Sequence, residues 1–174
     1  MPSGWRPRTL RMNPWKKEEP MIERILIATD GSESAHEALE FGLDLAAEQD
    51  ARAFVVHVAP AVDVMPYANF GYVGPSVQHE FNEHDRESLR EAAELAAAKG
   101  LDVETALLEG RPADEIVTYA DTIDADLIVV GSRGHGAIAS ALIGSVSRGV
   151  LHESRRPVLI VRGAHVAAEV GVPA

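Results

Sequence analysis

A glycine-rich segment in the second half of the chain holds the residues best suited to binding chemistry. Residues 131–136 read Gly-Ser-Arg-Gly-His-Gly directly after an apolar run, and Gly144-Ser145 opens the next amphipathic stretch. Closely spaced glycines let backbone amides turn toward an anion and approach it. A helix that begins at Ser145 adds unpaired amides and the positive end of its dipole. This spacing predicts a polyphosphate site; the alternative is a loop that needs glycine only for its turns.

Other phosphate-binding and nucleophilic chemistries do not fit the residues present. A P-loop requires Gly-Lys-Ser/Thr, and no lysine follows Lys99. A dinucleotide-binding fingerprint requires its glycines after the first strand, where this chain has Asp30-Gly31-Ser32. The sequence contains no cysteine and no residue cluster with the spacing of a zinc site, which excludes thiol catalysis and argues against zinc. Arg133 could reach a terminal phosphate; the alternative is that it faces solvent.

Apolar runs and amphipathic stretches alternate from residue 22 onward, which predicts an α/β domain. Runs rich in Val, Ile and Leu predict strands at residues 25–28, 53–58, 101–108, 126–130 and 157–161. Helical periodicity predicts helices at residues 35–46, 78–99, from Pro112 onward and at 145–153. Ser34 and Glu37 form a predicted capping box for the first helix, and Pro112 suits the first position of the third. Together these elements predict a doubly wound, Rossmann-like parallel sheet with helices on both faces.

The 174-residue chain is acidic, with 16 Lys and Arg against 27 Asp and Glu and a net charge of −11. We therefore expect no nucleic-acid partner. No secretory signal and no apolar run of about 18 residues is present, so we expect a cytoplasmic protein without a membrane anchor. Residues 1–20 are net positive and aperiodic, which predicts a flexible basic extension. We expect residues 21–162 to form the folded domain, which includes a long surface loop at residues 60–77. Residues 163–174 are expected to form a loose tail.

The glycines of the candidate loop have the spacing G-x2-G-x9-G-S, in which the fixed positions are Gly131, Gly134, Gly144 and Ser145. Further matching segments are residues 27–32, 57–58, 110–112, 126–131 and 156–161. By these motifs, in this order, residues 21–162 resemble the universal stress protein family in its ATP-binding branch.

The resemblance implies a five-stranded sheet of order 3-2-1-4-5, whose first and fourth strands end at the switch point where open α/β sheets bind ligands. It implies that Asp30 contacts the adenosine portion of ATP and that Val58 lines the adenine pocket. Loop amides and the Ser145 hydroxyl would hold the ribose and phosphates, and Ser147 would add a phosphate or Mg²⁺ contact. The implied binding residues are Ala28, Thr29, Asp30, Val58, Gly131, Arg133, Gly134, Gly144, Ser145, Val146 and Ser147.

The function implied by the resemblance is that of an ATP-dependent stress-response regulator or sensor, with Mg²⁺ or Mn²⁺ accompanying the nucleotide. Apart from Asp30, the loop offers no carboxylate to orient water and no lysine to neutralise transition-state charge, so we expect slow hydrolysis at most. Two alternatives stay open: an ATP-hydrolysing or nucleotidyl-transfer enzyme on a related fold, and a nucleotide-free dimeric scaffold.

Two further expectations concern single elements. The fifth strand is uniformly apolar and would lie at the sheet edge, which is an aggregation liability unless it is paired. The resemblance implies that two subunits pair through residues 157–162 as a homodimer. His57 ends a buried strand, and we expect it to be a structural histidine with satisfied hydrogen bonds rather than a ligand contact.

Overall fold

Strands and helices alternate strictly along the chain in the computed structural model, which describes residues 22–61, 81–134 and 143–162. In chain order the elements are β1 (Arg24–Ala28), α1 (Glu33–Gln49), β2 (Arg52–Pro60), α2 (Glu83–Ala98), β3 (Val103–Gly110), α3 (Pro112–Thr122), β4 (Leu127–Gly131), α4 (Ser145–Glu153) and β5 (Val158–Val161). The predicted alternation is confirmed, as are both ends of α4. The predictions for residues 1–20 and 163–174 lie outside the described residues, as does most of the predicted loop at 60–77.

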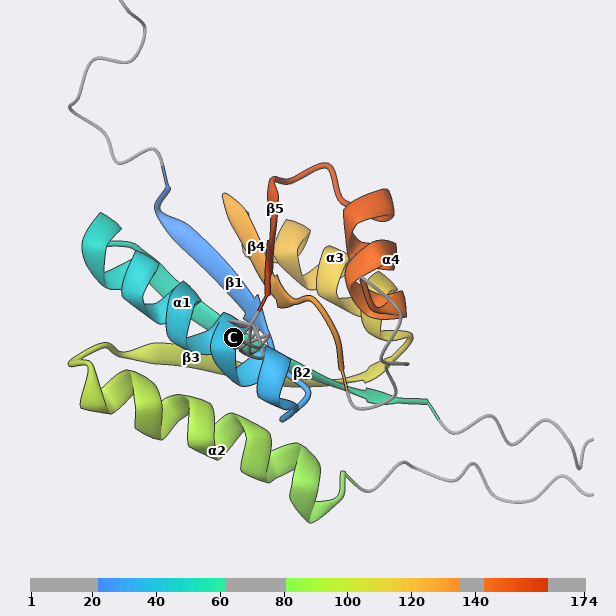
Figure 1. Ribbon diagram of the computed structural model, residues 1–174, viewed down its shortest axis with the longest axis horizontal. Helices are drawn as coiled ribbons and strands as arrows, with labels where there is room; N and C mark the ends of the chain where they lie inside the picture. Colours follow the sequence, from blue (N-terminus) through green and yellow to red (C-terminus); the bar gives the residue numbers. More distant parts are fainter. Residues whose placement is uncertain (1–21, 62–80, 135–142, 163–174) are drawn as a thin grey trace, which may run out of the picture.

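The five strands form one parallel sheet in the order β3-β2-β1-β4-β5 (Figure 1). This confirms the predicted fold class and strand order. β1 lies at the centre, where Ala28 pairs with Val56 of β2 on one side and with Val130 of β4 on the other. β2 and β3 follow on one side of β1, and β4 and β5 are then added on its other side. The ends of β1 and β4 therefore lie at the topological switch point, where a crevice is expected.

Helices cover both faces of the sheet, with α1 and α2 on one side and α3 and α4 on the other (Figure 1). Successive strand residues point to opposite faces, so each strand supplies both layers. Ile25 and Ile27 of β1 pack under α1 and α2, whereas Leu26 packs with Ile116 of α3 and Val150 of α4. None of the helices within the described residues is long and apolar enough to cross a membrane.

The capping box predicted at Ser34 and Glu37 is wrong, because α1 starts two residues earlier. Ser32 is the N-cap, and its side chain accepts a hydrogen bond from the Ala35 amide at 3.3 Å. The turn before it closes at Gly31, whose φ of +78° is a conformation that glycine adopts readily. Ser34 instead accepts a hydrogen bond from the Arg133 amide at 3.2 Å, and so ties α1 to the loop after β4.

α2 also differs from its prediction, since it begins at Glu83 rather than near residue 78. Asn82 is its N-cap and forms a reciprocal capping box with Asp85, the Asp85 amide donating to Asn82 at 3.0 Å and the Asn82 amide to Asp85 at 2.8 Å. Asp85 and Ser88 are buried on the same helix as Ala92 and Ala96. The helix therefore turns polar side chains inward over its first two turns and apolar ones further along.

Candidate functional site

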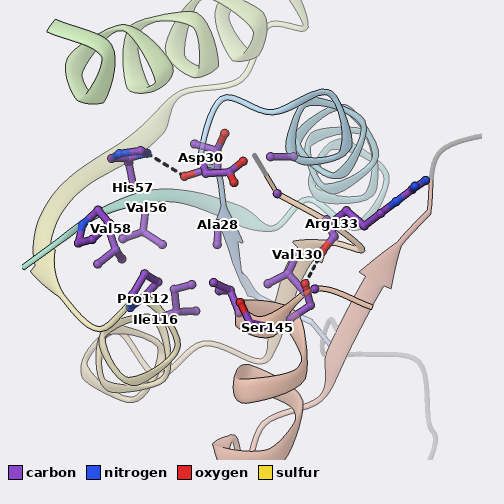
Figure 2. Close-up of a pocket in the computed structure, with 18 of the residues that line it drawn as sticks. Ala28, Asp30, Val56, His57, Val58, Pro112, Ile116, Val130, Arg133 and Ser145 are labelled. Carbon is purple, nitrogen blue, oxygen red and sulfur yellow. Dashed lines mark hydrogen bonds between the residues drawn. The ribbon is translucent and has the colours of Figure 1, made fainter. Parts of the chain in front are cut away.

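A cavity of about 640 Å³ lies where β1 and β4 end, at the reversal of strand order. Its wall combines the ends of three strands with the starts of α2, α3 and α4 (Figure 2). Every residue that the sequence motifs pointed to lies in this wall: Ala28, Thr29, Asp30, Val58, Gly131, Arg133, Gly134, Gly144, Ser145, Val146 and Ser147. The fold thus brings three distant segments of the chain to one place.

Apolar side chains form one part of the wall. Ala28, Val56 and Val58 from the strands lie across from Pro112 and Ile116 of α3 (Figure 2). Pro112 occupies the first turn of α3, as predicted, so its missing amide costs the helix no hydrogen bond. A concave apolar surface of this kind suits a flat ring system.

The start of α4 forms a second, polar part of the wall. Gly144 is the N-cap, and no side chain caps this helix end. The Gly144 amide itself donates to the Ser132 carbonyl at 2.7 Å, so the amides left without a helical acceptor at this end are those of the next residues. The first amides of a helix, here those of Ser145 and Val146, have no acceptor within the helix and carry its positive dipole end. An anion is the natural acceptor for such a group.

Ser147 is buried, and its hydroxyl donates to the Gly131 carbonyl at 2.6 Å. This bond fastens α4 to the end of β4. The hydroxyl proton is used there, which leaves the oxygen lone pairs as the part of Ser147 able to meet a ligand or ion. Ser145, by contrast, is exposed at the cavity rim.

The three glycines of the motif have different steric surroundings. A Cβ on Gly131 would lie 2.6 Å from the Ser34 carbonyl oxygen, so α1 packs directly on this residue. A Cβ on Gly134 would collide with the Asp30 carboxylate. A Cβ on Gly144 would meet nothing closer than 3.4 Å, and its φ of −68° suits any residue. The surrounding chain therefore requires glycine at position 131, whereas it does not at position 144.

Asp30 lines the same cavity, directly after the end of β1. One of its carboxylate oxygens accepts the Ser32 amide at 3.0 Å and the Ser32 hydroxyl at 2.6 Å. The other oxygen lies next to Gly134. These bonds fix the carboxylate at the end of β1, where it presents an acceptor for hydroxyl groups.

Two arginines belong to the wall, but they differ in position. Figure 2 shows the Arg133 side chain pointing away from the cavity, while its amide is bonded to Ser34. Arg148 of α4 also lines the cavity and was not found from the sequence, since one exposed arginine on a helix carries no local signal. Within the described residues, no three His, Asp or Glu side chains are grouped to hold a metal ion.

The sequence also missed the α2 side of the cavity, where Asn82, His84 and Asp85 line the wall with His57. Both ring nitrogens of His57 have partners, Thr29 O at 3.0 Å and Asp85 Oδ1 at 3.1 Å. The expectation of a satisfied histidine is therefore confirmed, although the residue also belongs to the cavity wall. An Asn followed three residues later by an acid is a helix-start pattern that could have located this end of α2.

A model of the universal stress protein family matches residues 21–162 of the chain. The chain belongs to this family. Universal stress protein YxiE of Bacillus subtilis is 36% identical over 148 residues, which cover 82% of this chain and 100% of that protein. Universal stress protein MJ0531 of Methanocaldococcus jannaschii is 34% identical over 146 residues, which cover 83% of this chain and 84% of that protein.

Solved structures share the architecture. One universal stress protein, crystallised in complex with cAMP, is 29% identical and superimposes with a TM-score of 0.63 over 81% of this chain and 97% of its own. The structure of hypothetical protein MJ0577 is 26% identical, with a TM-score of 0.70 over 82% of this chain and 97% of its own. The family predicted from the motifs is confirmed.

Proposed function

We propose that this universal stress protein binds ATP in the cavity at the ends of β1 and β4. The observation that carries the proposal is the division of one cavity wall into an apolar part and a part formed by glycines and a helix N-terminus. A nucleotide has the same division, with an apolar base at one end and anionic phosphates at the other. The similar universal stress protein that was crystallised with cAMP supports an adenine nucleotide as the ligand class.

Charge decides the orientation of the nucleotide. The Asp30 carboxylate repels phosphate and accepts hydrogen bonds from hydroxyl groups, which favours the ribose beside it. The base then lies between Val58 and Ile116, and the phosphates extend toward the amides of Ser145 and Val146. In this orientation each part of ATP meets the wall that matches its polarity.

A divalent cation would enter the site with the nucleotide. The described cavity wall has Asp30, Asp85 and two histidines but no grouping of three that could hold an ion by itself. The phosphates would therefore supply most of the ligands for Mg²⁺ or Mn²⁺, as they do at many nucleotide sites. The protein's part is to hold the phosphate end through α4.

The ligand itself is the first test. Mass spectrometry of small molecules released from freshly purified protein is expected to find an adenine nucleotide. Calorimetric titration is expected to rank ATP above AMP, because added phosphates gain contacts at the start of α4, and to rank ATP above GTP. A preparation that releases no adenylate and shows no heat with ATP would remove the proposal.

We further propose that the bound nucleotide acts as a regulatory signal in the cytoplasm rather than as a rapidly consumed substrate. Asp30 lies beside the proposed ribose, with one carboxylate oxygen bonded to Ser32, and Arg133 points away from the cavity at the phosphate end of the described wall. No side chain there is thus set to activate water. We expect turnover of ATP with Mg²⁺ to stay below about 1 s⁻¹, and sustained turnover above that range would favour the enzyme reading.

The edge strand β5 supports a proposal about assembly. Its residues Val158, Leu159, Ile160 and Val161 are each only half-buried, and within the described residues β5 pairs with β4 alone. We propose that a second copy pairs with this edge in a two-fold homodimer. Leu159→Lys is expected to halve the mass measured by light scattering in protein that still unfolds cooperatively. An unchanged mass would exclude this interface.

A further inference from the structure

A buried histidine–carboxylate pair joins β2 to α2 at the wall of the cavity. His57 and Asp85 are each 4% exposed, and His57 Nε2 lies 3.1 Å from Asp85 Oδ1. The other ring nitrogen lies 3.0 Å from the Thr29 carbonyl oxygen, at the end of β1 (Figure 2). One imidazole ring therefore connects β1, β2 and α2 at the point where all three reach the site.

Hydrogen-bonding capacity fixes how this contact works. The Thr29 carbonyl can only accept, so Nδ1 carries a proton and donates it. The contact between Nε2 and Asp85 then requires a second proton, because a bare nitrogen and a bare carboxylate are both acceptors. The other Asp85 oxygen accepts the Asn82 amide at 2.8 Å, within the first turn of α2, where a carboxylate is favoured. The contact therefore depends on both hydrogen-bonding partners, the His57 ring and the Asp85 side chain.

The loop that follows β1 contacts His57 and also α2, the helix that carries Asp85. The Thr29 amide donates to the Val56 carbonyl at 2.9 Å, and its hydroxyl accepts the Gly31 amide at 3.2 Å. Gly31 packs so closely on α2 that an added Cβ would lie 2.7 Å from the Ser88 hydroxyl oxygen. The position of residues 29–32 thus depends on where α2 begins and on the bond from His57.

We infer that the hydrogen-bonded His57–Asp85 pair is a positioning unit, which holds the loop carrying Asp30 in register with the nucleotide. The inference rests on the proposed function for its effect on ATP, and on the contacts above for its effect on the loop. The charged and titratable groups around the ring are Asp85 and His84 of α2, the His84 ring lying edge-on with centroids 6.4 Å apart, and Asp30 of the loop. Asp85 is the one among them that bonds the ring.

Three variants separate positioning from general stability. Asp85→Ala removes the acceptor and is expected to weaken ATP binding by about tenfold or more in calorimetry. Asp85→Asn keeps the hydrogen bonds to His57 and Asn82, since its amide nitrogen can donate to Nε2 while its amide oxygen accepts from the Asn82 amide. ATP affinity of this variant is expected to stay within about threefold of wild type. Glu40→Ala removes the carboxylate of the exposed His36–Glu40 pair and serves as the matched control, with unchanged affinity.

A ligand-free measurement distinguishes this inference from the proposed function. Amide NMR spectra are expected to show shifted resonances for residues 29–32 in Asp85→Ala, and wild-type positions in Asp85→Asn and Glu40→Ala. Wild-type affinity in Asp85→Ala, or equal weakening in both Asp85 variants, would overturn the inference. Unmoved loop resonances in Asp85→Ala would overturn it as well. Failure of wild-type protein to bind ATP would instead remove the proposed function, and the NMR result alone would then decide the positioning role.

Discussion

The two ends of the parallel sheet differ in what their backbone groups bind. At the amino-terminal end, Asp126 accepts the amides of Glu23 and Arg24, each at 2.9 Å. Arg156 donates to the Ala125 carbonyl at 2.9 Å. At this end, side chains thus provide hydrogen-bond partners for main-chain amides and carbonyls, and charged side chains pair with one another.

Arg156 illustrates how closely the amino-terminal end is paired. Its guanidinium bonds Asp121 at 3.0 Å and Asp124 at 3.3 Å. The hydrogen bond from Asp121 and then that from Asp124 raise the pKa of Arg156 above its usual value. The charge of Arg156 is therefore paired with the carboxylates of Asp121 and Asp124.

The start of α4, at the carboxyl-terminal end of the sheet, is built in the opposite way. α4 starts there without a side-chain cap, and its N-cap is a glycine whose surroundings leave room for a side chain. The same physical requirement, a partner for each buried or polarised backbone group, applies at both ends. Backbone groups that are satisfied by the protein's own side chains serve stability, whereas an uncapped helix start beside a cavity is a candidate for binding a ligand.

Substitutions at the glycines test most directly whether a position serves stability or ligand binding. The first is Gly131. Valine at this position would place Cβ 2.6 Å from the Ser34 carbonyl oxygen and 2.7 Å from its carbon, so α1 must move. We expect Gly131→Val to lower the free energy of unfolding by about 3 kcal/mol or more, or to prevent folding. Urea denaturation followed by circular dichroism measures this. A stable variant would mean that α1 moves away at little cost.

At Gly144 we expect a substitution to raise stability while it lowers ATP affinity. Gly144→Asp would supply the missing N-cap, for which the backbone already has suitable dihedral angles, with φ −68° and ψ 166°. We expect the free energy of unfolding to rise by about 0.5–1 kcal/mol. ATP affinity should fall by about 100-fold or more, because a carboxylate would occupy the anion position.

The matched control for this change is Gly144→Asn, which caps the helix as well without adding charge. Its stability should match that of Gly144→Asp, while its ATP affinity should fall less. Thermal unfolding and calorimetry measure the two quantities on the same samples. Undiminished ATP binding by Gly144→Asp would place the phosphates elsewhere than at α4.

Local patterns were enough to predict part of this molecule. The alternation of elements follows from apolar periodicity, and the cavity-lining segments follow from the motif and the strand order that the family resemblance implied. Pro112 and Ser145 mark helix starts with residues whose preference is local, so both boundaries were predicted correctly.

The remaining features depend on contacts between segments far apart in the chain. Asp85 lies among charged residues of an amphipathic helix, and only the rotation of α2 against β2 turns it toward His57. Ser34 looks like a helix cap by composition, but the approach of β4 makes it a bridge to Arg133. Likewise, the packing of α1 on Gly131 cannot be distinguished in sequence from an anion-binding glycine.

The amino-terminal end provides a prediction of intermediate size. Asp126→Ala would leave the amides of Glu23 and Arg24 without their acceptor. We expect the free energy of unfolding to fall by about 1–2 kcal/mol, because the site is partly exposed and water replaces some of the lost bonding. ATP affinity should not change, since Asp126 lies at the opposite end of the sheet.

Asp102→Ala is the matched control, because Asp102 is an exposed aspartate just before β3 with no hydrogen bond or ion pair within the described part of the chain. Its effect on stability should stay within about 0.5 kcal/mol. Urea unfolding of both variants, with calorimetry beside it, tests the separation of the two ends. A loss of ATP affinity in Asp126→Ala would show that the ends are coupled.

The smallest expected effect concerns Tyr119, which lies near the end of α3 and so belongs to the amino-terminal side of the sheet. Burial raises the pKa of its phenol, and the charge of Glu104 adds to the increase. The unfolded chain titrates this group near its ordinary pKa of about 10 and therefore releases the proton first as pH rises.

The contribution of Tyr119 to the free energy of unfolding is therefore fully present below a pH of about 10, and it is lost as the pH rises toward the pKa of the folded protein. We expect Tyr119→Phe to lose less thermal stability than wild type between pH 9 and 11. If the melting temperatures of the two proteins fall equally between pH 9 and 11, the Tyr119 phenol contributes nothing to the loss of stability at high pH.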